Sequence, residues 1–152
     1  MSARLFDAKQ VRRAFSRSAA GYDAAARLQH AVEARLLESL DYLDDPALKR
    51  EAPRRVLDLG CGTGRASLAM QKRWPKAQVL SLDLALPMLQ QARVASGRPA
   101  GAWLSNPFAR TPVPVCADAR ALPLAEASVD VLFSNLCLQW VEDLDAVFAG
   151  FR

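Results

Sequence analysis

The sequence contains few of the residues from which metal centres and acid–base catalytic sites are usually built. Among its 152 residues there is one histidine, His30, and there are three widely separated cysteines, Cys61, Cys116 and Cys137. No C-x-x-C pair is present, and a zinc site needs more ligands at closer spacing. We therefore predict no metal site. We interpret Cys61, which no histidine accompanies, as a small space-filling residue rather than a nucleophile.

Long apolar runs are missing as well. No run approaches the roughly 20 apolar residues of a membrane-spanning helix. The first residues, MSARLFDAKQVRRAF, contain no apolar block of the kind found in signal peptides. Because the number of cysteines is odd and no secretion signal is seen, we expect a protein of the reducing cytoplasm without a membrane partner.

The net charge is only mildly positive, at +4, and aromatic residues do not alternate with the basic ones. A stacking platform for nucleic acid is therefore not expected. Part of the excess lies near the start of the chain, where Asp7 is the one acid beside Arg4, Lys9, Arg12, Arg13 and Arg17. Such a cluster is more often a solvated helix face than a docking patch for an acidic partner, and both interpretations stay open.

Two helices are predicted within residues 1–52, which we expect to form an N-terminal helical cap. The first, residues 7–18, has an apolar face made of Val11, Ala14 and Phe15. The second, residues 23–40, carries an apolar stripe at three- and four-residue spacing, made of Leu28, Val32, Leu36, Leu40 and Leu43. His30 lies off this stripe, so we expect its side chain to be exposed.

From residue 53 to residue 152 the pattern becomes strand, turn and helix in repeated order. Strands are predicted at 56–59, 78–82, 113–116 and 129–134, and helices at 65–74, at 87–96 and from 144 onward. This alternation, with nearly continuous apolar strands, predicts an α/β fold with a parallel sheet between helices on both faces. The connection GRPAGAWLSNPFARTPVP would be irregular and held to the body by Trp103 and Phe108.

A doubly wound sheet of about four parallel strands is incomplete. The fourth predicted strand, VDVLFS, is apolar on both faces, as a central strand would be. Here it would lie at the edge of the sheet, where unpaired backbone groups invite self-association. We therefore expect a C-terminally truncated chain.

The stretch VLDLGCGTG, residues 56–64, joins the first strand to a helix through three glycines. It is one residue short of the dinucleotide pattern G-x-G-x-x-G, and no Gly-Lys-Ser/Thr follows as in a phosphate-binding P-loop. Asp58 lies two residues before the first glycine, where its carboxylate would repel a pyrophosphate. The loop therefore favours a ligand that carries a cation, such as an ammonium or a sulfonium.

Two further acids follow the second and third predicted strands, Asp83 and Asp118. The first is placed to accept both hydroxyls of a ribose, and the second to accept from the exocyclic amine of adenine. Three acids at successive strand ends around a bare loop fit a nucleoside with a cationic tail, which predicts S-adenosylmethionine. Taken alone, Asp83 or Asp118 fits a helix N-cap equally well, and Asp58 fits a role in the loop's own backbone.

The motifs VLDLGCGTG, LSLDLALPML, ADARALPL and VDVLFSNLCLQWVED resemble the successive motifs of class I S-adenosylmethionine-dependent methyltransferases. The resemblance covers residues 55–152 and implies a Rossmann-like three-layer sandwich. It implies that Asp58 and the loop glycines hold the methionine end of the cofactor, Asp83 the ribose and Asp118 the adenine. The full implied set is Asp58, Gly60, Cys61, Gly62, Gly64, Asp83, Leu84, Asp118, Ala119 and Asn135.

The stretches AFSRSAAGYDAAARLQHAVEARLLESL and FSNLCLQWVEDL resemble the malonyl-acyl-carrier-protein O-methyltransferases of biotin synthesis. That resemblance implies methylation of the free carboxylate of a malonyl thioester, carried by acyl-carrier protein or coenzyme A. The substrate-side candidates it implies are Tyr22, Asn135 and Gln139, with Leu136 beside them. Tyr22 fits a packing role between cap and body equally well. No catalytic base is assured, which suits a carboxylate nucleophile.

Three alternatives stay open. One is a methyltransferase of the same fold that acts on another small molecule, such as a quinone precursor. Another is a truncated, non-catalytic fragment that binds the cofactor. A nicotinamide-dependent oxidoreductase is the most distant alternative, because the glycine pattern is short by one residue.

Overall fold

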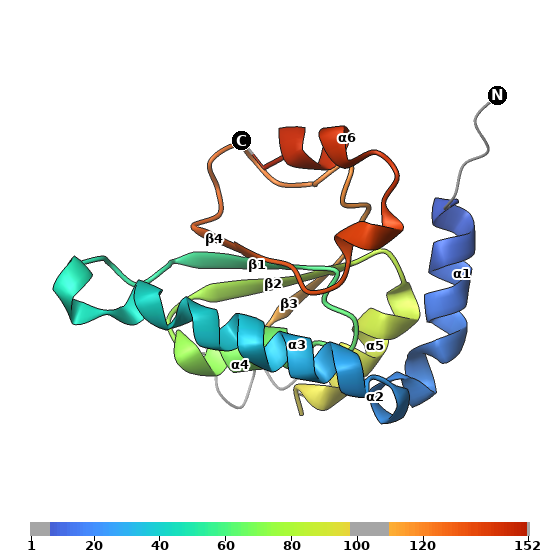
Figure 1. The fold of residues 1–152 in the computed structure, drawn as a ribbon, viewed down its shortest axis with the longest axis horizontal. Helices are drawn as coiled ribbons and strands as arrows, with labels where there is room; N and C mark the ends of the chain where they lie inside the picture. The colour runs from blue at the N-terminus through green and yellow to red at the C-terminus, as the bar shows by residue number, and fades with distance from the viewer. Residues whose placement is uncertain (1–6, 98–109, 152) are drawn as a thin grey trace.

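The computed structural model describes residues 7–97 and 110–151. Its centre is a sheet of four parallel strands in the order β3-β2-β1-β4 (Figure 1). The strands are β1 (Arg55–Leu59), β2 (Gln78–Asp83), β3 (Val113–Cys116) and β4 (Val131–Phe133). The predicted parallel α/β sheet is therefore confirmed. The predicted contacts of Trp103 and Phe108 lie outside the described residues.

The two central strands bury both of their faces, which explains their continuous apolar sequence. On one face, Val56 and Val79 pack with Met70 of α4 (Arg65–Arg73). On the other face, leucines of β1 and β2 pack with Val147 of α6 (Leu144–Ala149). Figure 1 shows α4 below the sheet and α6 above it. The predicted three-layer arrangement is confirmed.

Helices α4 and α5 begin directly after β1 and β2 and point back along the sheet. The predicted start of α4 at Arg65 is confirmed, and its end is followed by Trp74 and Pro75. Helix α5 (Leu86–Ala95) has Pro87 in its first turn, as predicted. Both helices end within one residue of the predicted positions.

The N-terminal segment is a series of short helices. It contains α1 (Ala8–Ser18), α2 (Tyr22–Ala25) and α3 (Arg27–Glu38), with 3-10 turns η1 (Ala19–Gly21), η2 (Ser39–Asp44) and η3 (Pro46–Leu48). The prediction of one helix over 23–40 is wrong, because the chain bends at Ala26, whose side chain is buried against the body. The bend separates α2 from α3.

The predicted apolar stripe is confirmed only in its second half. Leu40 is buried and Leu36 packs against the core, whereas 69% of Leu28 is exposed. Val32 is also exposed. The reason is that the first turns of α3 lie beside the glycine loop and present polar side chains to it. His30 belongs to this polar side and is 22% exposed in its side chain, so the prediction of an exposed histidine is wrong.

Strand β4 is shorter than predicted and forms an edge of the sheet. It pairs with β1 through three residues, with Leu132 opposite Leu57, and has no strand on its outer side within residues 7–97 and 110–151. At its start, Asp130 Oδ2 accepts hydrogen bonds of 2.8 Å from the backbone N–H groups of Arg54 and Arg55. This carboxylate fixes the register between β1 and β4. In the described part of the chain, no helix is both long and apolar enough to cross a membrane.

Candidate functional site

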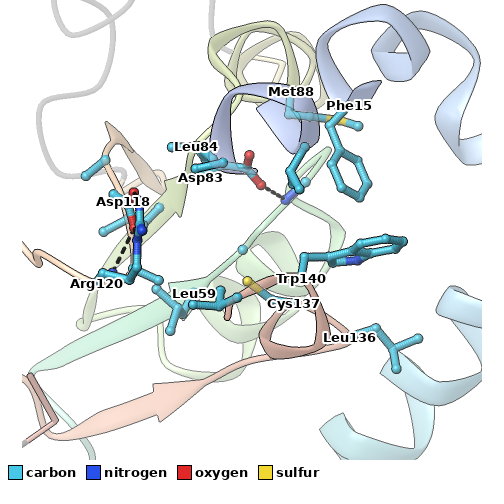
Figure 2. Close-up of a pocket in the computed structure, with 18 of the residues that line it drawn as sticks. Phe15, Leu59, Asp83, Leu84, Met88, Asp118, Arg120, Leu136, Cys137 and Trp140 are labelled. Carbon is cyan, nitrogen blue, oxygen red and sulfur yellow. Dashed lines mark hydrogen bonds and ion pairs between the residues drawn. The ribbon is translucent and has the colours of Figure 1, made fainter. Parts of the chain in front are cut away.

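The carboxyl ends of the four strands meet at one edge of the sheet, where they form a pocket (Figure 2). We call it the strand-end pocket. Helix α1 and the loop after β4 close its far side. It is lined by Ala8, Val11, Phe15, Tyr22, Leu59, Gly60, Gly62, Leu82, Asp83, Leu84, Met88, Ala117, Asp118, Ala119, Arg120, Asn135, Leu136, Cys137, Trp140, Val141 and Glu142. This is the place at which an open parallel sheet binds ligands.

Two glycines of the loop after β1 line this pocket for different reasons. Both have positive φ, +74° at Gly60 and +53° at Gly62, a backbone region that favours glycine. A Cβ atom at Gly60 would collide with the Cys137 side chain, so the absence of a side chain lets β1 and the loop after β4 approach. A Cβ atom at Gly62 would meet nothing within 4 Å. The Gly62 backbone therefore stays open to a ligand.

Gly64 does not line the pocket, which departs from its expected place beside the cofactor. It caps α4 with φ +81°, and a Cβ atom there would lie 2.7 Å from Ala92 Cβ. Its small size therefore allows α5 to pack against the start of α4. The sequence motif does not distinguish a glycine kept for packing from one kept for a ligand.

Asp83 connects the glycine loop to the end of β2. Its Oδ2 atom accepts from the Gly62 N–H at 2.9 Å, and its Oδ1 atom accepts from the Ala85 N–H at 2.8 Å at the start of α5. Burial raises the pKa of this carboxyl group. The N-cap interpretation is therefore wrong, because the N-cap of α5 is Ala85 and Asp83 accepts only from the N–H of that residue, in the turn before the helix. The Asp83 side chain lines the pocket, beside Leu84. A carboxylate oxygen has a second lone pair, which is available to a ligand.

Asp118 lies across the pocket, after β3. Its oxygens accept from Arg120 at 3.0 Å (Nε) and 2.6 Å (NH2), and Oδ1 also accepts from the Arg120 N–H. These hydrogen bonds lower the pKa of Asp118, which keeps it ionised. Ala119 is buried beneath it. The sequence pattern did not single out Arg120, whose effect is to fix the direction of this carboxylate (Figure 2).

Asp58 faces α4 instead of the strand-end pocket. It is 2% exposed and accepts a 2.6 Å hydrogen bond from the Ser67 hydroxyl, which in turn accepts from the Ser81 hydroxyl at 2.7 Å. Burial raises its pKa to about 7. Burial therefore favours the protonated form of Asp58, whereas a nearby cation would favour its ionised form.

Asp58 opens instead onto a second, smaller pocket between α3 and the glycine loop, which we call the cap pocket. It is lined by Tyr22, Gln29, His30, Glu33, Asp58, Gly60, Cys61, Gly62, Thr63, Arg65, Ala66 and Asn135. Tyr22, Gly60, Gly62 and Asn135 line both pockets. The two pockets are therefore neighbouring parts of one site.

Two buried polar atoms of the cap pocket have no hydrogen-bond partner within the described residues, His30 Nε2 and Asn135 Oδ1. The His30 atom lies 3.4 Å from Asp23 Oδ1, within ion-pair distance but without a hydrogen bond. Asn135 donates through Nδ2 to the Gln29 carbonyl at 3.1 Å. Because buried polar atoms are rarely left unsatisfied, these two atoms indicate a place for a polar ligand group.

The cap is tied to the glycine loop at two points. The Thr63 hydroxyl donates to Asp23 Oδ1 at 2.7 Å, and Arg65 Nε lies 3.4 Å from Glu33 Oε1. Burial raises the pKa of Glu33, and Arg65 opposes this shift. The cap helices are therefore held beside the loop by polar contacts across the cap pocket.

The three cysteines differ in burial and in pKa. Burial raises the pKa of Cys61 well above its ordinary value and that of Cys137 to about 11. Both thiols are therefore protonated at neutral pH, which supports a space-filling role for Cys61 over a nucleophilic one. Cys116 is exposed, and all three are free. Within the part of the chain that the structure describes, no group of histidine, cysteine or acidic side chains could hold a metal ion.

Aromatic side chains that the sequence did not assign to the site close the strand-end pocket. The rings of Phe15 in α1 and Trp140 in η5 (Leu138–Trp140) meet edge to face, with centroids 5.7 Å apart. Tyr22 lies 6.2 Å from Phe15 by centroid, so it both packs and faces the pocket. Gln139, by contrast, is exposed and lines neither pocket, whereas its neighbour Trp140 lines the strand-end pocket while staying 39% exposed.

A family model described as a methyltransferase domain matches residues 57–152. The chain belongs to the methyltransferase domain family. Within this family, the chain is 62% identical over 148 residues to a malonyl-[acyl-carrier protein] O-methyltransferase of Xylella fastidiosa (strain M23), covering 97% of the chain and 45% of that relative. A protein of the same name from Gallionella capsiferriformans (strain ES-2) is 44% identical over 145 residues, covering 95% of the chain and 46% of the relative.

Solved structures share the fold of this methyltransferase domain. A putative S-adenosyl-L-methionine-dependent methyltransferase from Methanococcus maripaludis superposes with a TM-score of 0.67 at 19% identity, covering 99% of this chain and 61% of that one. Magnesium protoporphyrin IX methyltransferase from Synechocystis PCC 6803, solved with bound SAM, gives a TM-score of 0.63 at 18% identity, covering 96% and 69%. The fold is that of Rossmann-like class I methyltransferases. The chain spans about half the length of the relatives in the preceding paragraph.

Proposed function

We propose that this chain binds S-adenosylmethionine and takes part in the transfer of its methyl group to the free carboxylate of a malonyl thioester. This reaction is a step of biotin synthesis, and we propose that it takes place in the cytoplasm. The acceptor is suggested by the two relatives named malonyl-[acyl-carrier protein] O-methyltransferase, of which the nearer is 62% identical over 97% of this chain. We further propose that residues 1–52 act as a cap on the methyltransferase domain of residues 53–152.

The observation that carries the cofactor assignment is the arrangement of polar groups around the open Gly62 backbone. Asp83 and Asp118 line the strand-end pocket, with apolar walls between them. These residues fit a ribose and an adenine base. The cap pocket, with Asp58 and the unpartnered atoms of His30 and Asn135, fits the amino-acid end. In this proposal Gly60 and Cys61 flank that end, and Leu84 and Ala119 flank the base.

When bound, S-adenosylmethionine would supply a methyl group that is already activated on a sulfonium and that a carboxylate oxygen can accept. The acceptor carries its own negative charge and needs no deprotonation. This suits the strand-end pocket, which no histidine or lysine lines within the described residues. The task left to the chain is to orient the two reactants and exclude water. Phe15 and Trp140 contribute by closing the pocket with apolar surface.

The cofactor assignment is tested by calorimetric titration of the chain with S-adenosylmethionine, comparing Asp83→Ala with Asp130→Ala. Each carboxylate accepts hydrogen bonds from two backbone N–H groups, so Asp130→Ala controls for the loss of such bonds, although Asp83 is partly buried and Asp130 is exposed. Asp83 lines the pocket, whereas Asp130 lies at the opposite edge of the sheet. We expect saturable binding that Asp83→Ala weakens at least about tenfold and Asp130→Ala leaves unchanged. Equal losses in both variants would reduce Asp83 to a structural role, and no binding by the folded parent chain would remove the cofactor assignment.

The acceptor assignment is tested by assaying methyl transfer to malonyl-acyl-carrier protein, to malonyl-CoA and to a phenolic quinone precursor. Transfer to malonyl thioesters alone supports the proposal. Transfer to the phenol alone would favour a methyltransferase of the same fold with another acceptor, and cofactor binding without any transfer would favour a non-catalytic role for this chain. Self-association through the outer edge of β4 is tested separately by sedimentation.

A further inference from the structure

We propose that the outward face of α1 is the docking surface for an acidic carrier protein that presents the thioester to the strand-end pocket. This inference rests on the function proposed above. It assigns a role to the basic cluster near the start of the chain, whose charged residues do not line the cofactor site.

Helix α1 has two faces of different character. Its apolar face places Ala8, Val11 and Phe15 in the wall of the strand-end pocket. The opposite face carries Lys9, Arg13 and Arg17 at successive four-residue intervals, with Arg12 beside them, all exposed. At 1.5 Å per residue this row is about 12 Å long. A single helix therefore forms the wall of the pocket on one side and a strip of positive charge on the other.

Most of the charge on this strip does not stabilise the helix that carries it. Like charges four residues apart destabilise a helix by roughly 0.2–0.5 kcal/mol per pair, and a lysine in the first turn opposes the helix dipole, whereas only Arg17, in the last turn, favours it. Helix α1 itself contains no acid, and the carboxylate of Asp7 caps it by accepting from the Lys9 N–H at 3.0 Å. No ion pair of the four α1 cations occurs within residues 7–97 and 110–151. The charge is therefore available to a partner.

The shape of the strip favours an acidic protein over a small anion. A row about 12 Å long matches the acidic face of a helix, whereas one phosphate would contact only one or two of its side chains. The position is suitable as well, because the strip lies on the reverse of the pocket wall. A carrier docked there would be separated from the pocket by the width of one helix, about 10–12 Å. Electrostatic complementarity of this kind mainly accelerates association and selects the partner.

The test neutralises the strip and, as a matched control, an equal charge elsewhere. The strip variant is Lys9→Gln/Arg13→Gln/Arg17→Gln. The control is Arg54→Gln/Lys72→Gln/Lys76→Gln, whose three side chains are also exposed and lie before β1, in the last turn of α4 and before β2. Affinities for malonyl-acyl-carrier protein, malonyl-CoA and S-adenosylmethionine are measured for both variants and the parent at low and raised salt.

We expect the strip variant to bind the carrier protein roughly tenfold more weakly than the parent, with a smaller salt dependence. Its affinities for malonyl-CoA and S-adenosylmethionine should stay unchanged, and the control should match the parent in all three. Unchanged carrier affinity in the strip variant, or an equal loss in the control, would overturn the inference. So would an equal loss for malonyl-CoA, which would indicate a general anion site. The S-adenosylmethionine titration tests the proposed function separately. If the parent chain does not bind the cofactor, the proposed function fails, whatever the affinities for the carrier protein are.

Discussion

The two central strands and the two outer strands of this sheet differ in how much of their surface is buried. In β1 and β2 every residue between the ends is buried, including the carboxylate of Asp58. In β3 and β4 only Phe133 is buried. The centre therefore holds most of the packing free energy and fixes the glycine loop. The outer strands deliver Asp118 and Asn135 to the site at little cost in packing. The central strands thus contribute mainly to stability, and the outer strands contribute mainly side chains that can contact a ligand.

The largest test of this contrast compares two leucines that are neighbours across the β1–β4 pairing. Leu57 is 1% exposed and Leu132 is 37% exposed, and the two lie opposite each other in register. We expect Leu57→Ala to lower the free energy of unfolding by about 3–5 kcal/mol, since it leaves a cavity in a packed core. Leu132→Ala should cost less than about 1 kcal/mol. Urea denaturation measures both, and equal losses would show that β4 is as firmly packed as β1.

A second test uses the buried charge of the central strands. Because the pKa of Asp58 is raised to about 7 in the folded chain, folding favours its protonated form. Its contribution to stability is full below the ordinary pKa near 4 and is lost as the pH rises to about 7, by on the order of 4 kcal/mol at most. Asp58→Asn should remove this decline in urea denaturation followed from pH 4.5 to 7.5.

Asp130→Asn is the control for that measurement, with the opposite sign. The backbone N–H groups of Arg55 and Arg54 lower the pKa of Asp130, so its contribution is present above the ordinary pKa and is lost as the pH falls. Its replacement should leave the decline toward neutral pH intact. If Asp58→Asn also leaves the decline unchanged, the buried carboxylate is not its source.

A third test separates stability from binding within the glycine loop. Gly60→Ala would force the new Cβ atom into Cys137, so we expect a loss of about 2 kcal/mol or more in stability. Gly62→Ala meets no neighbour and should cost only the backbone strain of a positive φ, about 1 kcal/mol. Calorimetry should nevertheless show that Gly62→Ala weakens S-adenosylmethionine binding severalfold. Binding at the parent's affinity would show that the open space at Gly62 is not used by the cofactor.

The smallest expected effect concerns the tie between the cap and the loop. Thr63→Val keeps the shape of the side chain and removes its hydroxyl donor to Asp23. The loss of one hydrogen bond to a charged group should lower stability by about 1–2 kcal/mol. Proteolysis of the cap should quicken accordingly. Ser96→Ala, which removes a hydroxyl that donates to the Arg93 carbonyl at the end of α5, serves as the control away from the cap, and an equal change there would show a general effect of losing a hydroxyl donor.

The sequence predicted the parallel sheet and its helices to within a few residues, because alternating apolar strands and helices leave few ways to bury both faces of β1 and β2. The site was predicted less completely. Asp83 and Asp118 were found because strand ends are visible in the sequence, and Asn135 was implied by the family resemblance; all three line the strand-end pocket. Gly64 and Gln139 lie elsewhere because the loop motif and the turn after β4 do not reveal which way each residue faces.

The contribution of the N-terminal helices was the least visible in the sequence. The bend at Ala26 turns His30 and Glu33 toward the glycine loop, which a helical period of 3.6 residues cannot show when the helix is broken. Arg120 and Trp140 entered the site through contacts with groups far away in sequence or along a turn. The contact of Trp140 with Phe15 depends on the tertiary arrangement, whereas that of Arg120 with Asp118 spans only two residues and depends on how the turn after β3 folds.

The three thiols differ in exposure, so one of them can be labelled selectively. Cys116 is exposed, whereas Cys61 and Cys137 are partly buried and their thiols are protonated at neutral pH. Cys116 is also the residue that lies opposite Asp83 in the β2–β3 pairing. A fluorescent maleimide would therefore label the natural sequence at one place, next to the strand-end pocket, and would turn ligand binding into an optical signal without any engineered cysteine.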